Sequence, residues 1–113
     1  MTERVVTDEF MQEMRGKAKL YTLALISRGP GWDTPDRDTV IWEHGRRNHA
    51  LRLDQVLAIV GPIPDDSPLV GLYIFDRTPE EVEQIMGGDP AVQAGVFVFD
   101  VHPLVAFPGD GLP

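Results

Sequence analysis

The chain has 113 residues, the size of one small domain, of which 42% are hydrophobic and 25% charged. This composition is typical of a folded globular protein. Its 18 acidic and 10 basic residues give a formal net charge of -8, which opposes binding to nucleic acid. The absence of cysteine excludes disulfides, thiolate nucleophiles and cysteine-ligated metal sites.

The N-terminal segment lacks an apolar run of signal-peptide length, and no apolar stretch reaches the roughly 20 residues that span a bilayer. We therefore expect a cytoplasmic protein with no membrane partner. Residues 1–18 are interpreted as an N-terminal extension with a short helix at "TDEFMQEM", residues 19–107 as a single folded domain, and residues 108–113 as a turn-rich tail.

The first half of the domain predicts a strand and then a helix. Residues 19–27 are short and apolar and precede a Gly-Pro-Gly breaker, which is typical of a buried strand. Residues 38–57 are long enough for a helix, and Trp42, His49 and Leu53 fall on one apolar stripe of it. We therefore interpret His49 as a buried, hydrogen-bonded core histidine.

The second half predicts two strands, a helix and a last strand. Residues 58–64 and 68–76 read as a hairpin joined by the turn residues of "PDDS". Thr78 as N-cap, Pro79 at the first helical position and Glu81 in a capping box mark a helix start, and two glycines at 87–88 end that helix. The last strand covers residues 95–104.

The element order therefore predicts an α+β fold of the ferredoxin-like βαββαβ type. It implies a four-stranded antiparallel sheet, in strand order 4-1-3-2, with two helices on one face. The other face should be polar in a monomer, yet Tyr21, Leu23 and Leu25 make it apolar in the first strand. Because two helices cannot cover both faces, we expect a homodimer through the uncovered sheet face.

The topology also predicts where chemistry can gather. The first helix starts at the sheet edge where the last strand begins, so His44 and Asp89 should lie close together. Trp32, in the preceding loop, and the hairpin with Asp66 and Ser67 should reach the same edge. An imidazole beside a carboxylate is an acid/base unit. Asp89 is equally suited to cap the turn that Pro90 opens, and one carboxylate can do both.

Other features of the sequence are less informative. Arg47 follows His44 on the helix and is suited either to an anionic substrate or to an ordinary solvated surface. The three histidines do not form a metal-binding pattern, and the glycines match no phosphate-binding loop. We therefore expect no metal and no cofactor.

Several of these motifs together resemble the YciI-like (YCII-related domain) family. They are His44 in "EHGRRN", "GP" at residues 61–62 followed by "DDS", and "DPAVQAGVF" leading into "VHP". The resemblance implies a dimeric α/β barrel with an active site at His44 and Asp89. At Gly45 and Asn48 this chain departs from the leucines that are common in the family, which leaves His49 as an alternative functional histidine.

The residues and the resemblance together predict a small cofactor-independent enzyme acting on a compact cyclic or aromatic metabolite. In this hypothesis His44 moves a proton and Asp89 orients its ring, as a lyase, a dehydrochlorinase or an isomerase requires. Arg47, Trp32, Asp66 and Ser67 are the candidates for substrate binding. The alternative is a non-catalytic dimeric module that binds a small molecule or another protein in the same cleft.

Overall fold

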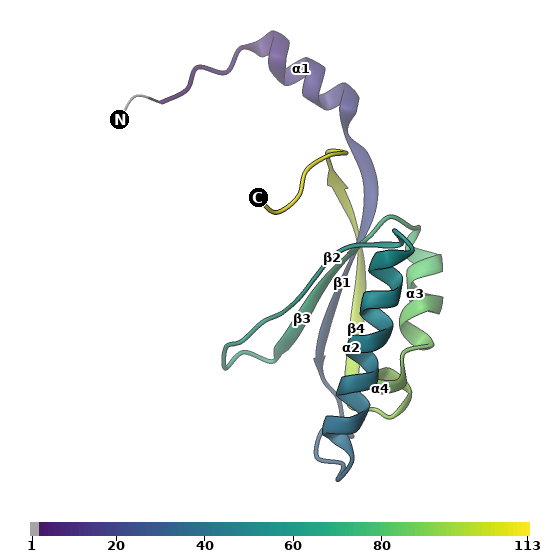
Figure 1. Ribbon diagram of the computed structural model, residues 1–113. Coiled ribbons are helices and arrows are strands. Elements are labelled where there is room, and N and C mark those ends of the chain that lie inside the picture. Colours follow the sequence, from purple (N-terminus) through teal and green to yellow (C-terminus); the bar gives the residue numbers. More distant parts are fainter. Residues whose placement is uncertain (1–2) are drawn as a thin grey trace.

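A computed structural model describes residues 3–113, so the first two residues of the predicted extension lie outside the described part. Its elements follow the predicted order, with one additional short helix before the last strand (Figure 1). They are α1 (Asp8–Lys17), β1 (Lys19–Arg28), α2 (Arg37–Leu53), β2 (Leu57–Pro62), β3 (Leu69–Phe75), α3 (Pro79–Gly87), α4 (Pro90–Gln93) and β4 (Phe97–Ala106).

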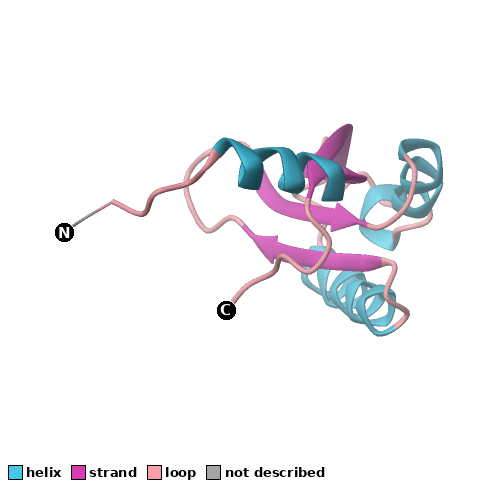
Figure 2. Cartoon of the chain, turned by 90° about the horizontal axis from the view of Figure 1, so that it is seen from above, coloured by secondary structure: helices cyan, strands magenta, loops and turns pink. Residues whose placement is uncertain are grey.

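The four strands form one antiparallel sheet in the order β2-β3-β1-β4. In its middle, Ala24 of β1 pairs with Tyr73 of β3 on one side and with Val101 of β4 on the other. The helices α2 and α3 lie along the same face of this sheet (Figures 1 and 2). The predicted ferredoxin-like α+β fold and its strand order are therefore confirmed.

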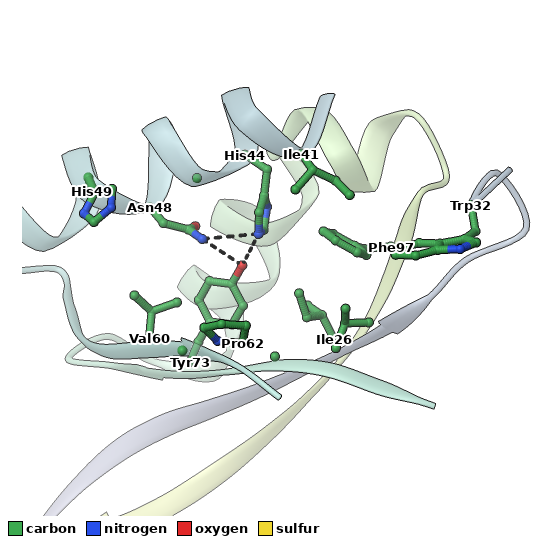
Figure 3. A pocket seen from close by; sticks show the side chains of 14 residues that line it. Ile26, Trp32, Ile41, His44, Asn48, His49, Val60, Pro62, Tyr73 and Phe97 are labelled. Atoms are coloured by element: carbon green, nitrogen blue, oxygen red, sulfur yellow. Dashed lines mark hydrogen bonds between the residues drawn. The ribbon is translucent and has the colours of Figure 1, made fainter. Parts of the chain in front are cut away.

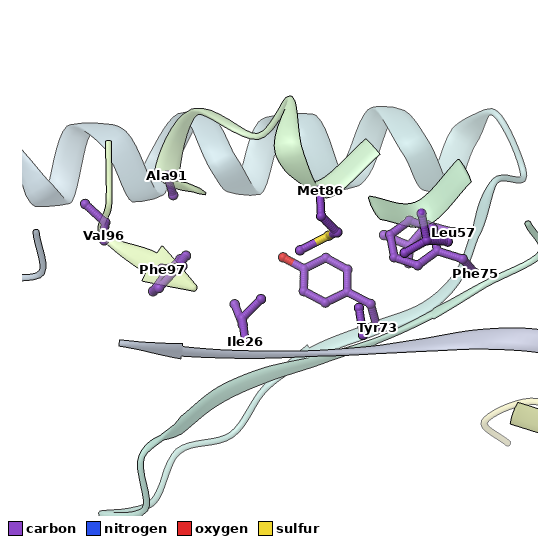
Figure 4. Close-up of a cluster of buried hydrophobic side chains, with 10 residues drawn as sticks. Ile26, Leu57, Tyr73, Phe75, Met86, Ala91, Val96 and Phe97 are labelled. Atoms are coloured by element: carbon purple, nitrogen blue, oxygen red, sulfur yellow. The ribbon is translucent and has the colours of Figure 1, made fainter. Parts of the chain in front are cut away.

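The hydrophobic core fills the space between the sheet and these helices (Figure 4). β1 contributes side chains at every second position, since successive strand residues point to opposite faces. Val82 and Met86 of α3, one helical turn apart, close the core from above. Among residues 3–113, the buried apolar residues of this core are Ala24, Ile26, Leu57, Tyr73, Phe75, Val82, Met86, Ala91, Val96 and Phe97.

The helix α2 ends at Leu53, earlier than the predicted end at residue 57. The chain leaves the helix through a Schellman motif, in which the Gln55 N–H donates to the Arg52 carbonyl and the Val56 N–H to the Leu51 carbonyl, each at 3.0 Å. The motif needs a left-handed residue, and Gln55 supplies it with φ of 61°. Helical periodicity continues past this point in the sequence, which is why the prediction ran too far.

Replacing Gln55 with glycine should raise the free energy of unfolding by about 0.5–1 kcal/mol. A left-handed conformation costs an L-residue roughly 1–2 kcal/mol, and the extra backbone entropy that glycine loses on folding offsets part of the gain. Urea denaturation measures the change. The matched variant Gln84→Gly changes an exposed residue in the middle of α3, and its free energy of unfolding should instead fall by about 1 kcal/mol. Equal effects at the two positions would contradict the left-handed conformation of Gln55.

The prediction that Trp42, His49 and Leu53 form a buried stripe on α2 is wrong. Trp42 and Leu53 are 70% and 85% exposed, and His49 is exposed as well. The buried positions of this helix are instead His44 and Asn48, one turn apart. His44 and Asn48 bond to one another and to the layer beneath. They share the inward face with three apolar residues that pack against the core, Val40, Ile41 and Leu51.

In the described part of the chain, no helix covers the second face of the sheet. Thr22, Ala24 and Ile26 of β1 are buried beneath α2 and α3, while Leu23 and Leu25 alternate onto the uncovered face and are half-buried. The register aligns Leu23 with Ile74 and His102, and Leu25 with Leu72 and Asp100. We call these six residues the open face. It is apolar on the two central strands and polar on the β4 edge.

The N-terminal helix α1 precedes the first residue of β1 and stands clear of the other elements (Figure 1). Thr7 caps it by accepting a hydrogen bond from the Phe10 N–H at 3.2 Å, and the helix buries none of its residues. Within residues 3–113, no helix has both the length and the hydropathy to cross a bilayer.

Candidate functional site

A cavity of about 370 Å³ lies between α2 and the sheet, beside the hairpin of β2 and β3 (Figure 3). Most of its wall is apolar, and His44, Asn48, His49 and Tyr73 are its polar side chains. The principal apolar lining residues are Ile26, Trp32, Ile41, Val60, Val70 and Phe97. The dimensions and the lining suit a compact, mostly apolar molecule with few polar groups.

Asp89 is fixed by the junction between α3 and α4. It is the N-cap of α4, where its Oδ1 accepts a hydrogen bond from the Ala91 N–H at 2.8 Å, and Pro90 follows at the first helical position. The residue is only 1% exposed. The predicted cap is therefore confirmed, and it uses one carboxylate oxygen while leaving the other free.

The second oxygen of Asp89 meets His44, as the topology predicted. His44 Nδ1 lies 2.7 Å from Asp89 Oδ2, and both side chains are at least nine-tenths buried. An ionised carboxylate can only accept, so Nδ1 carries the proton. The Phe97 ring packs against the imidazole with its centroid 5.0 Å away, in an edge-to-face arrangement. Together these contacts fix the tautomer and the orientation of His44.

The Asp89 carboxylate stays ionised despite its burial. Burial alone raises the pKa of an acid, but the hydrogen bond and charge interaction with His44, the Ala91 N–H bond and the positive charge of Arg47 outweigh it. The pKa of Asp89 therefore lies below its ordinary value. Arg47 Nη1 is 3.9 Å from Asp89 Oδ2, close enough for charge attraction without a direct hydrogen bond.

The other nitrogen of His44 contacts two residues that the sequence analysis missed. His44 Nε2 lies 2.9 Å from the Tyr73 hydroxyl and 3.2 Å from Asn48 Nδ2 (Figure 3). Asn48 Nδ2 also donates to the Tyr73 hydroxyl at 3.2 Å. A signal for Asn48 was present, because His44 and Asn48 are four residues apart on a helix. Tyr73 gave no such signal, since it alternates with the apolar residues of β3.

The structure separates the other predicted site residues. Trp32 lies in the cavity wall, and the guanidinium carbons of Arg28 and Arg37 are each 4.6 Å from its ring centroid. Arg47 is directed at Asp89 and lies outside the cavity lining. Its guanidinium packs against Gly88, where an added Cβ would lie only 3.0 Å from Arg47 Nη2.

Asp66 and Ser67 lie outside the cavity, contrary to the prediction that the hairpin turn would join the site. The strands of the hairpin contribute Val60 and Val70 to the wall, but its turn projects away from the helices (Figure 1). Ser67 is held there by a local turn, in which its N–H donates to Asp65 Oδ1 at 2.9 Å.

His49 lies at the cavity but away from the carboxylate. Its Nδ1 contacts the Arg52 guanidinium at 3.0 Å, and its side chain is exposed. Of the two candidate histidines, His44 is therefore the one held against Asp89. Among residues 3–113, no group of three or more histidine and acidic side chains is arranged to hold a metal ion.

Comparisons with known proteins assign this chain to no family. No protein-family model matches it, and no curated protein matches its sequence. Among solved structures, the crystal structure of the methylated RPA0582 protein aligns with 94% of this chain and 96% of that one, at 16% identity and a TM-score of 0.42.

Proposed function

We propose that the protein is a small cofactor-independent enzyme that uses His44 and Asp89 for acid–base chemistry on a compact cyclic or aromatic metabolite. The observation that carries this proposal is the buried 2.7 Å contact between His44 Nδ1 and Asp89 Oδ2 at the wall of an apolar cavity. The ionised acid fixes the ring and stabilises an imidazolium, so His44 can take up a proton and return it.

The His44–Asp89 pair and the apolar cavity indicate the class of reaction. Removal of a proton next to an activated carbon, followed by loss of a leaving group or by reprotonation elsewhere, needs one acid/base residue and a dry pocket. A lyase, including a dehydrochlorinase, or an isomerase fits these requirements. The resemblance to the YciI-like family supports the same assignment through His44 and the Asp89-Pro90 pair.

We also propose that the chain works as a cytoplasmic homodimer through the open face. Leu23 and Leu25 on β1 and Leu72 and Ile74 on β3 form an apolar surface without a helix over it. Apolar patches of this kind on a sheet mark interaction sites, and a two-fold pairing of identical faces buries both at once.

A non-catalytic binding module is the second candidate function, favoured by one observation. Both ring nitrogens of His44 have protein partners, with Asp89 at Nδ1 and Tyr73 and Asn48 at Nε2. A ligand therefore does not meet a free imidazole nitrogen. In such a module the polar cluster would orient a bound molecule and leave it unchanged.

A substrate screen with small cyclic acids and quinols distinguishes the two candidates. Thermal shift identifies compounds that bind, and mass spectrometry of the mixture detects conversion. For a converted compound, His44→Gln should lower the rate by about 10²–10⁴, the usual contribution of general acid/base catalysis. The control variant Glu83→Gln, at an exposed position of α3 outside the cavity and the open face, should retain the wild-type rate. Binding without conversion, or full turnover by His44→Gln, would reject the enzyme proposal.

A further inference from the structure

The exposed side of α2 carries a second hollow beside the cavity of the candidate site. It has a volume of about 470 Å³, and we call it the outer hollow. Its lining comes from α2 alone and consists of Asp38, Ile41, Trp42, Gly45, Arg46 and His49. Three of these residues, Ile41, Gly45 and His49, also line the cavity that holds His44, here called the inner cavity (Figure 3). The two hollows therefore meet along α2.

Three neighbouring rows of side chains on α2 explain this arrangement, because residues four apart follow one another along a row of a helix. The rows are Asp38, Trp42 and Arg46 facing outward, His44 and Asn48 facing the sheet, and Ile41, Gly45 and His49 between them, at the edge of the inward face. The middle row is the ridge between the two hollows. Its central residue, Gly45, has no side chain.

Gly45 leaves a notch in this ridge. Ile41 and His49 are eight residues apart, which is about 12 Å along the helix axis. Apart from the adjacent helical backbone, a Cβ added at Gly45 would have no described atom within 4 Å. The space above Gly45 is therefore open from the inner cavity to the outer hollow.

The fold itself does not require a glycine at this position. Gly45 lies in the middle of the 17-residue α2, where glycine is less favourable than any other residue except proline. Its backbone is helical, and no neighbouring side chain occupies the place of a Cβ, in contrast to Gly88, which Arg47 approaches. The missing side chain therefore fits a role in ligand access.

We propose that the outer hollow is a second subsite and that the ligand has two rings. The first ring occupies the inner cavity, and a flat apolar second ring passes over Gly45 onto Trp42. This inference rests on the proposed function, because it extends the ligand site proposed there. Gly45 is then the residue that determines how long a ligand the site accepts.

The outer hollow favours a flat apolar group over a charged one. Trp42 is 70% exposed, so its indole ring offers a large surface on which a second aromatic ring can stack. The charged groups at the rim already have partners. Arg46 is paired with Glu43 at 3.1 Å. Asp38 is paired with Arg37 at 3.7 Å.

Phenol and 4-phenylphenol test this subsite without knowledge of the natural ligand. The chain has two tryptophans, Trp32 at the inner cavity and Trp42 at the outer hollow, so their indole N–H signals in a proton–nitrogen NMR spectrum report the two hollows separately. Phenol should shift the Trp32 signal alone, and 4-phenylphenol should shift both signals. The two-ring probe should bind about tenfold more tightly, because its second ring loses water where it lies on Trp42.

Two variants of α2 remove the subsite in different ways. Gly45→Leu fills the notch, and Trp42→Ala removes the stacking surface. Each should lower the affinity for 4-phenylphenol about tenfold, to that of phenol, and leave phenol binding unchanged. Both should fold, since leucine favours a helix more than glycine does and Trp42 is exposed. The matched control Leu53→Ala truncates an exposed apolar residue of α2 outside both hollows and should leave both affinities unchanged.

The outcomes separate this subsite from the proposed function. If 4-phenylphenol shifts only one of the two tryptophan signals, or if its tenfold advantage survives in either variant, the subsite is overturned. A shift of Trp32 by phenol then leaves the proposed function standing. If neither probe shifts the Trp32 signal of the wild type, the inner cavity binds no ring, and both proposals are overturned.

Discussion

Replacing Asp89 with alanine should lower the free energy of unfolding by roughly 2–4 kcal/mol. The variant loses the cap of α4, worth about 1 kcal/mol, and leaves the buried His44 Nδ1–H without an acceptor, which costs about 1–3 kcal/mol. Small domains are stable by only about 5–15 kcal/mol, so this loss is large. Chemical denaturation at neutral pH measures it, and a change below 0.5 kcal/mol would contradict the geometry described above.

The matched variant Asp89→Asn separates the cap from the acid. Asparagine caps helices as well as aspartate does, so the bond from the Ala91 N–H should survive. Its amide N–H₂ cannot accept from His44 Nδ1, however, and the ring should move its proton to Nε2. Nitrogen NMR of the imidazole reports this change of tautomer. The expected loss of stability is about 1–2 kcal/mol.

The contribution of the Asp89 charge should depend on pH in a defined direction. Because the pKa of Asp89 is lowered in the folded protein, its ionised form stabilises the fold wherever the acid is ionised in both states. The part of the stability difference between wild type and Asp89→Asn that comes from this charge should therefore shrink below about pH 4, where the unfolded chain takes up the proton first, and vanish below the folded pKa. A difference that grows as the pH falls below about 4 would reject the lowered pKa of Asp89.

Replacing Leu23 with glutamate should abolish the proposed dimer at micromolar concentration. Leu23 lies at the centre of the open face, beside Ile74 and His102 in the register. In a two-fold interface the substitution buries two charges, and at about 2 kcal/mol each the dissociation constant should rise by roughly 10³. Sedimentation velocity over a concentration series measures this change.

The control for this prediction lies on the same strand. Leu20→Glu makes the same chemical change three residues earlier, at a position that is 68% exposed and alternates onto the opposite side of the sheet. It should leave the dimer intact. A wild-type protein that sediments as a monomer, or equal effects of the two substitutions, would reject the open face as the interface.

The predicted dimer interface and the predicted contact between His44 and Asp89 have different origins in the sequence. The second apolar face could be read from β1 alone, because strand residues alternate and both alternating sets are apolar. The link between His44 and Asp89 needed the strand order as well. That order was itself predictable, since short connections and antiparallel neighbours leave few ways to arrange four strands and two helices.

What the sequence determined by itself was local or followed from connectivity. The capping box at Thr78 and Glu81 depends on residues three apart, and Asp89 caps the turn that begins one residue later. The His44–Asp89 contact also followed, because both residues sit beside element ends that the topology brings to one edge.

Only the tertiary structure decided which face of α2 is buried, and with it the remaining site residues. His49 and Trp42 lie on the predicted stripe, yet the helix turns His44 and Asn48 inward beside the apolar Val40, Ile41 and Leu51. Their burial depends on hydrogen bonds to Tyr73 and Asp89, which come from distant parts of the chain. A periodicity count includes no such partners, so it gives no weight to polar residues on the inward face. The orientation of α2 depends both on the packing of its apolar residues against the core and on these bonds between layers.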